Sequence, residues 1–115
     1  MAKEVEKKNK TYWLAYDLGV GGDYQSLYAW LDDHEAKSCG DSLAYFKYSY
    51  NEGQDPDEVL KKELCNKIKL NPNNKLYIIR KKDTNDKTVG SFIFGKRNAS
   101  PWEGFGSKSS GEEDA

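Results

Sequence analysis

Two segments of the chain alternate hydrophobic and polar positions with the period of a β-strand. The first, Thr11–Leu18, carries apolar groups on both faces, which predicts a strand in the centre of a sheet. The second, Ser42–Tyr50, has the same period. Two shorter apolar runs, Leu76–Ile79 and Thr88–Phe94, predict further strands. The segment 36–41 is either a loop or a brief strand that enters a hairpin.

Two other segments predict helices, because their apolar residues recur at i, i+3, i+4 and i+7. The first helix follows Asp23, which is suited to an N-cap, and extends to about Glu35. The second begins at Asp55-Pro56, a cap followed by proline at the first helical position. The residues expected to be buried are Tyr24, Leu27, Tyr28 and Leu31 in the first helix and Val59, Leu60, Leu64 and Ile68 in the second.

The order of these elements is βαββαβ with an added C-terminal strand. We therefore expect an α+β protein with an antiparallel sheet, both helices on one face and a ferredoxin-like plan. The expected organisation is a flexible charged lead at 1–10 and a single domain at 11–97. An aromatic docking segment at 98–106 and a disordered acidic tail at 107–115 follow it.

The charge balance, the cysteines and the apolar content limit the partners that the chain is expected to have. The chain has 115 residues with 18 Lys and Arg, 19 Asp and Glu and a net charge of −1. The part up to residue 97 carries a balance of +2 and the remainder −3, which permits a nucleic-acid partner without requiring one. The 2 cysteines lack metal-ligand spacing. We expect a cytoplasmic protein with no membrane partner, since no apolar run approaches the ~20 residues of a membrane span and no secretory signal is seen.

Asp17 is the candidate catalytic residue, because it closes the strand expected in the middle of the sheet. Mg²⁺, or Mn²⁺ in its place, is often held by only one or two carboxylates together with waters and phosphate. A two-fold dimer would bring two copies of Asp17 together for phosphodiester cleavage. The alternative is structural: Asp17 accepts hydrogen bonds within the turn formed by Gly19–Gly22. Asp23 is interpreted as a helix cap.

Basic residues gather in the second half of the chain. A hairpin with this charge can contact phosphate groups, with an affinity that falls as salt rises. Tyr45 and Tyr77 are candidates for stacking on bases. The alternative is a solvated hairpin whose charges keep strand edges from aggregating. The candidate nucleic-acid-binding residues are Lys47, Arg80, Lys81, Lys82, Lys96 and Arg97.

Trp102 and Phe105 stand in an otherwise polar segment near the C-terminus. We expect them to form an interface by docking onto the body or onto a second copy of the chain. The alternative is a recognition motif for another protein.

The chain resembles the small CRISPR-associated protein 2 family and its SinR-like relatives, and more distantly the virulence-associated protein D toxins. The resemblance covers about 11–105, and it depends on the order and spacing of its motifs. These motifs are AYDL (Ala15–Leu18), GDYQSLYAWL (Gly22–Leu31), GDSLAYFKYS (Gly40–Ser49), DPDEVLKKEL (Asp55–Leu64) and NNKLYIIR (Asn73–Arg80).

The resemblance implies a ferredoxin-like homodimer that associates with RNA or DNA, and in some members a metal-dependent nuclease. Its acidic metal ligand corresponds to Asp17, and a second acidic position corresponds loosely to Asp23. Tyr24-Gln25-Ser26 stands where the family commonly has basic residues. The leading hypothesis is nucleic-acid binding in defence or mobile-element biology, with a defence-system protein as a further partner. The alternatives are a non-catalytic dimeric scaffold and a ribonuclease toxin.

Overall fold

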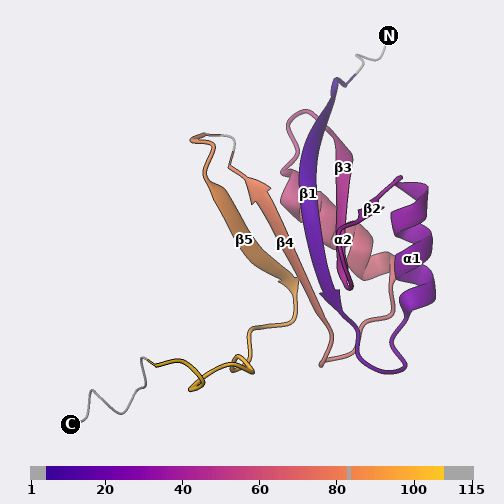
Figure 1. Cartoon of the computed structure of the whole chain (residues 1–115). Helices are drawn as coiled ribbons and strands as arrows, with labels where there is room; N and C mark the ends of the chain where they lie inside the picture. Colours follow the sequence, from indigo (N-terminus) through magenta and orange to yellow (C-terminus); the bar gives the residue numbers. More distant parts are fainter. Residues whose placement is uncertain (1–4, 83, 108–115) are drawn as a thin grey trace.

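The computed structural model describes residues 5–82 and 84–107. Five strands and two helices follow one another along the chain (Figure 1). Of the expected lead at 1–10, residues 1–4 lie outside the described residues, and so do residues 108–115 of the expected acidic tail at 107–115. The elements are β1 (Lys7–Asp17), α1 (Tyr24–Asp33), β2 (Lys37–Ser38), β3 (Leu43–Asn51), α2 (Pro56–Lys67), β4 (Lys75–Lys81) and β5 (Thr88–Phe94).

The strands form one antiparallel sheet in the order β2-β3-β1-β4-β5, so the α+β prediction is confirmed. β1 pairs with β3 on one edge and with β4 on the other, which confirms its central position. β1 begins at Lys7, earlier than the expected Thr11, and Lys7–Lys10 pair with the end of β3. β2 is a strand of only 2 residues.

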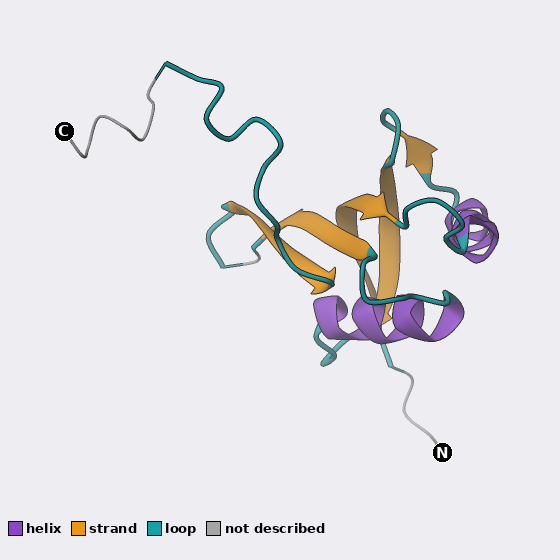
Figure 2. Ribbon diagram, turned by 90° about the horizontal axis from the view of Figure 1, so that it is seen from below, coloured by secondary structure: helices purple, strands orange, loops and turns teal. Residues whose placement is uncertain are grey.

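Both helices contribute to one hydrophobic core on a single face of the sheet. Figure 2, seen from below, shows their position relative to the strands. Alternate residues of β1, β3 and β4 point into this core, as a period of two requires. Among the described residues, no helix is long and apolar enough to cross a membrane. The core consists of Tyr12, Leu14, Leu18, Leu27, Trp30, Leu31, Ala44, Phe46, Tyr48, Leu60, Leu64, Ile68, Leu76, Ile78 and Ile93.

The buried face of α1 is rotated from the predicted one. Tyr28 was expected inside, yet it is 53% exposed, whereas Trp30 is buried. The Trp30 ring packs edge-on against Phe46, and its indole N–H donates to Glu63 of α2 at 2.7 Å. Glu63 also accepts the hydroxyl of Tyr48 at 2.6 Å, so this carboxylate joins both helices to β3. Burial, and then this hydrogen bond to Glu63, raise the pKa of Tyr48.

A second polar network fastens α2 to the centre of the sheet. Asp57, in the first turn of α2, accepts a hydrogen bond from the hydroxyl of Tyr12. It also accepts two from the guanidinium of Arg80, from Nη2 at 2.6 Å and from Nε at 3.0 Å. Arg80 also donates to the hydroxyl of Ser91 at 3.1 Å. The side chains of Arg80 and Asp57 are only 14% and 24% exposed. The pair is thus shielded from water, and loss of either partner leaves the other charge poorly compensated.

Replacing Arg80 by methionine (R80M) should therefore lower the free energy of unfolding by about 1–3 kcal/mol, the range for hydrogen bonds to charged groups. Chemical denaturation measures this change. The control, Lys82→Met, removes a positive charge from a nearby exposed position. Equal stability of the two variants would show that the Arg80 network contributes nothing.

Candidate nucleic-acid interface

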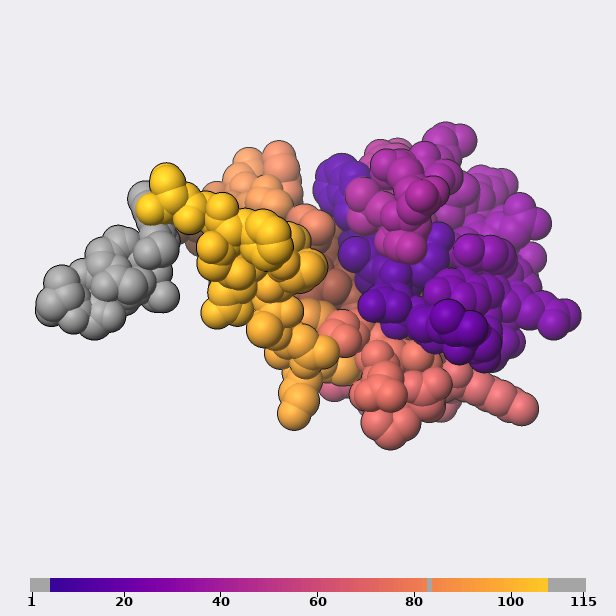
Figure 3. Space-filling model, turned by 60° about the horizontal axis from the view of Figure 1, so that its bottom comes forward, coloured from indigo at the N-terminus to yellow at the C-terminus, as the bar shows by residue number. Residues whose placement is uncertain are grey.

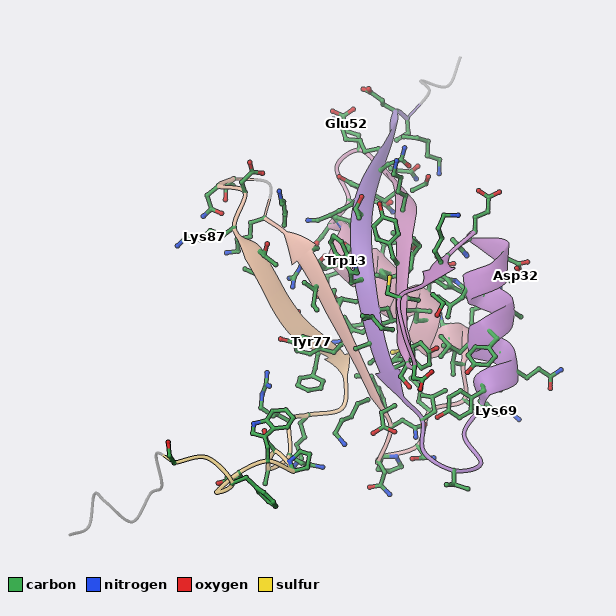
Figure 4. All side chains as sticks on the ribbon, viewed as in Figure 1. Trp13, Asp32, Glu52, Lys69, Tyr77 and Lys87 are labelled. Atoms are coloured by element: carbon green, nitrogen blue, oxygen red, sulfur yellow. The ribbon has the colours of Figure 1, made fainter. Side chains whose placement is uncertain are left out.

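The sheet face opposite the helices carries a band of aromatic and aliphatic side chains, which we call the open face. Its members follow from the register, since residues paired directly across strands share a face. Trp13 and Tyr77 lie on the neighbouring strands β1 and β4 (Figure 4). The half-buried apolar residues of the open face are Trp13, Ala15, Leu43, Tyr45, Tyr77, Ile79 and Phe92.

Four of these residues form two aromatic pairs. Trp13 and Tyr45 are direct partners on β1 and β3, with ring centroids 5.3 Å apart at an interplanar angle of 47°. Tyr77 and Phe92 are partners on β4 and β5, with centroids 4.8 Å apart and the rings edge to face at 72°. The open face therefore carries one aromatic pair on each side of its centre.

Because Gly90 has no side chain, the Tyr77 ring of the Tyr77–Phe92 pair can lie close to its backbone. A Cβ atom at Gly90 would lie 2.3 Å from the hydroxyl oxygen of Tyr77 and 2.7 Å from two carbons of its ring. A glycine inside a strand often marks a close approach of neighbouring groups, and here Tyr77 is the group that approaches. On the other side of the ring pair, the guanidinium carbon of Arg97 lies 5.8 Å from the centroid of Tyr77 and 5.5 Å from that of Phe92. Both distances are within the range of a cation–π contact.

The charge of the open face is strongly one-sided. The charged strand residues that share it are five lysines and a single acid, Asp17, at the end of β1. Arg97 adds a further cation beside the second aromatic pair. The near-neutral charge of the whole chain conceals this surface, because most acids stand elsewhere. The lysines are Lys7, Lys37, Lys47, Lys75 and Lys81.

The predicted basic residues do not lie together. Lys47 and Lys81 stand on the open face, and Arg97 lies over its rings. Arg80 points to the helix side, where it pairs with Asp57 at 2.6 Å. Lys82 and Lys96 are exposed in the segments that flank β4 and β5. Arg80 therefore has a structural contact with Asp57, and its contact with nucleic acid stays a prediction.

Asp17 stands at the tip of central β1, as expected, and its side chain is exposed. It accepts the backbone N–H of Gly19 at 3.1 Å, the hydrogen bond of the structural alternative. Lys75 lies opposite Asp17 in the register, so an ammonium group shares its face. Asp23 caps α1 and accepts the backbone N–H groups of Lys69 at 2.9 Å and Ser26 at 3.2 Å, which together lower its pKa.

A magnesium ion fits poorly at Asp17 within one chain. The described residues contain no group of three or more His, Cys, Asp or Glu side chains able to hold a metal ion. Asp23 is committed to the two backbone N–H groups, and Lys75 supplies positive charge beside the only carboxylate. We therefore derive no metal-dependent step from this site, and the nuclease expectation remains a prediction.

Trp102 and Phe105 do not dock onto the body within this chain. They are 71% and 85% exposed, in the segment that follows β5. Figure 3 shows this segment in yellow at one end of the molecule, beside β5 and apart from β1 and α1. The expected contact with a second copy is a matter for experiment.

Several open-face residues escaped sequence reasoning. Trp13 was noticed only as an apolar residue of the first strand, and Lys7 fell in the expected lead. Phe92 had no distinctive neighbours in the sequence, and Lys75 stood out only as one of the basic residues of the second half. Two kinds of information together identify them: the alternation of side chains between the two faces along each strand, and the pairing of residues between neighbouring strands. Parity alone was readable from the sequence, but the register was not.

Comparisons with family models, with curated proteins and with solved structures find no match to this chain. The resemblance to CRISPR-associated protein 2 therefore remains an expectation based on the motifs alone.

Replacing Gly90 by alanine (G90A) should displace the Tyr77 ring, because the new methyl group and the hydroxyl cannot occupy the same space. The aromatic proton resonances of Tyr77 and Phe92 are expected to shift in NMR spectra. Gly106→Ala is the matched control, since no atom lies within 4 Å of the added methyl group there. Unchanged Tyr77 resonances in G90A would contradict the described packing.

Proposed function

We propose that this chain binds single-stranded nucleic acid on the open face of a ferredoxin-like fold. The observation that carries the proposal is the combination of two aromatic pairs with five lysines and Arg97 on one sheet face. Aromatic side chains stack on bases of any sequence, and cations beside them contact the backbone phosphates. The order β2-β3-β1-β4, with β5 added, is compatible with the ferredoxin-like plan and leaves this face uncovered by helices.

Single strands suit this surface better than duplexes. Bases must be unstacked to reach Trp13 or Tyr77, and unpaired bases in loops or extended strands meet that requirement. A broad sheet face also presents no single helix or ribbon for insertion into a duplex groove. Ala15 and Ile79 are the direct cross-strand partners of Tyr77 and Trp13, so the centre of the face is apolar.

A second candidate function is protein interaction through the C-terminal aromatic residues. Trp102 and Phe105 are exposed large side chains, of the kind that anchor interfaces. A chain truncated after Arg97 tests this alternative by sedimentation and thermal melting. If these residues join two copies, truncation weakens the dimer and leaves the stability of the monomer unchanged.

Trp13→Leu should weaken the binding of a fluorescent single-stranded oligonucleotide about tenfold, because base stacking on one aromatic ring contributes about 1–3 kcal/mol. Fluorescence anisotropy measures the dissociation constant, with RNA, DNA and duplex probes compared. Val59→Leu alters a partly buried hydrophobic residue of α2 and serves as the control. Equal weakening by both variants would assign the effect to general destabilisation.

The salt dependence separates phosphate contacts from stacking. Each of the variants Lys47→Gln and Lys75→Gln should reduce the slope of log affinity against log salt by about 0.7. The control, Lys62→Gln, removes an exposed cation from α2, on the helix side of the sheet. If Lys62→Gln reduced the slope as strongly as Lys47→Gln, the assignment of the phosphate contacts to the open face would be refuted.

Asp17→Asn should tighten binding about twofold, because it removes the only acid among the open-face strand residues. The same anisotropy titration is run with and without Mg²⁺. Weaker binding or loss of a Mg²⁺-dependent cleavage in this variant would instead support the metal-ligand hypothesis.

A further inference from the structure

A separate hollow lies between α1 and the segment 36–44, with a volume of about 570 Å³. This volume falls in the range of small-molecule sites. None of the open-face aromatic residues lines it, and it shares only Lys37 and Leu43 with the open face. A ligand in the hollow would therefore not require the aromatic pairs of the proposed nucleic-acid site. Its walls include three tyrosines, Tyr16, Tyr24 and Tyr28, and two acids, Asp32 and Asp41.

The three tyrosines form one aromatic cluster. The ring centroid of Tyr16 lies 6.5 Å from that of Tyr24 and 6.2 Å from that of Tyr28. The centroids of Tyr24 and Tyr28 are 5.6 Å apart. The ring planes meet at angles between 47° and 75°. The three rings are therefore inclined to one another and do not form a flat stack.

Tyr28 is one of the exposed large hydrophobic residues of the chain. It lies on the helix face predicted to be buried, yet it is 53% exposed at the border of the hollow. Trp30 occupies the core in place of Tyr28, so the packing of α1 against the sheet does not need the Tyr28 ring. Tyr28 contacts Tyr16 and Tyr24, and because it is 53% exposed, the rest of its ring is available to a ligand.

The charges of the walls select the sign of the ligand. Asp32 on α1 and Asp41 before β3 stand against a single cation, Lys37. Asp41 also contributes, after burial, Tyr28 and Tyr24, to the raised pKa of Tyr16. Tyrosine is a neutral phenol at neutral pH, and the electron-rich face of its ring attracts cations. Anionic ligands are disfavoured.

We infer that this hollow binds an alkylated ammonium group, such as a quaternary ammonium head or a methylated lysine side chain. The faces of tyrosine rings attract such cations, and the methyl groups bury apolar surface against the same rings. A bare metal ion is a poorer match, because it requires several oxygen ligands in fixed geometry. The described residues include no group of three or more acidic, His or Cys ligands.

The test compares choline with 3,3-dimethyl-1-butanol, which has the same shape without the charge. NMR titration of the full chain follows the resonances of Tyr24, Tyr28 and Asp32. Choline is expected to shift them in a saturable way, and the neutral alcohol is expected to bind at least about twofold to fivefold more weakly. Equal affinity for the two compounds would overturn the inference, as would the absence of binding by any cationic probe.

Two variants assign the binding to the hollow. Tyr28→Leu and Asp32→Asn change exposed or half-exposed side chains, and each is expected to weaken choline binding about twofold to fivefold. The control is Asp33→Asn, which neutralises the adjacent exposed acid of α1 that does not line the hollow. Equal effects of Asp32→Asn and Asp33→Asn would reduce the site to general electrostatic attraction and refute it.

A further arm distinguishes the two sources of the ligand. A short peptide with trimethyllysine is titrated beside the same peptide with unmodified lysine and beside choline. Tighter binding of the trimethylated peptide assigns the hollow to a modified protein chain. Tighter binding of choline assigns it to a free small molecule.

Discussion

The pairing of β1 on both of its edges is the constraint on which the rest of the structure depends. A strand hydrogen-bonded to β3 and β4 cannot rotate about its axis, so the parity of each residue fixes the face on which its side chain lies. Tyr12 and Leu14 enter the core, and Trp13 is held on the opposite face. The two helices cover one face only, and the other face is left to its own side chains.

The same parity separates residues that the sequence places side by side. Arg80 and Lys81 are neighbours on β4, yet Arg80 lies among core-side polar groups and Lys81 lies on the open face. The positive charge of Arg80 is balanced by Asp57, whereas the open-face lysines lack acidic cross-strand partners apart from the pairing of Lys75 with Asp17. The electrostatic character of this protein is therefore a property of its faces rather than of its composition.

The sequence was sufficient for the elements whose apolar pattern is strong. The alternation in Thr11–Leu18 predicted a central strand, and Asp55-Pro56 predicted the start of α2, both of which are confirmed. The pattern in α1 was misleading, because Tyr28 continues the apolar spacing while Trp30 packs against buried Phe46 and donates a hydrogen bond to Glu63. Contacts between distant elements decided that competition, and no local pattern encodes them.

Other features depended on long-range geometry. Lys7–Lys10 carry no apolar signal, yet the length of β3 provides partners for them, and β1 extends accordingly. The hydrogen bond between Tyr12 and Asp57 joins residues 45 positions apart. The candidate interface could be predicted only in part, since Lys47, Lys81 and Tyr77 were identified while Trp13 and Phe92 required the register, which a bulge between Leu76 and Tyr77 shifts.

The close approach of Tyr77 to Gly90 has an evolutionary consequence. A residue with a side chain at position 90 is excluded only while the tyrosine ring occupies the space above it. In a lineage that exchanged Tyr77 for a small residue, position 90 would become open to the β-branched residues that strands favour. The two positions are thus expected to diverge together, and a homologue with a bulky residue at one should carry a small residue at the other.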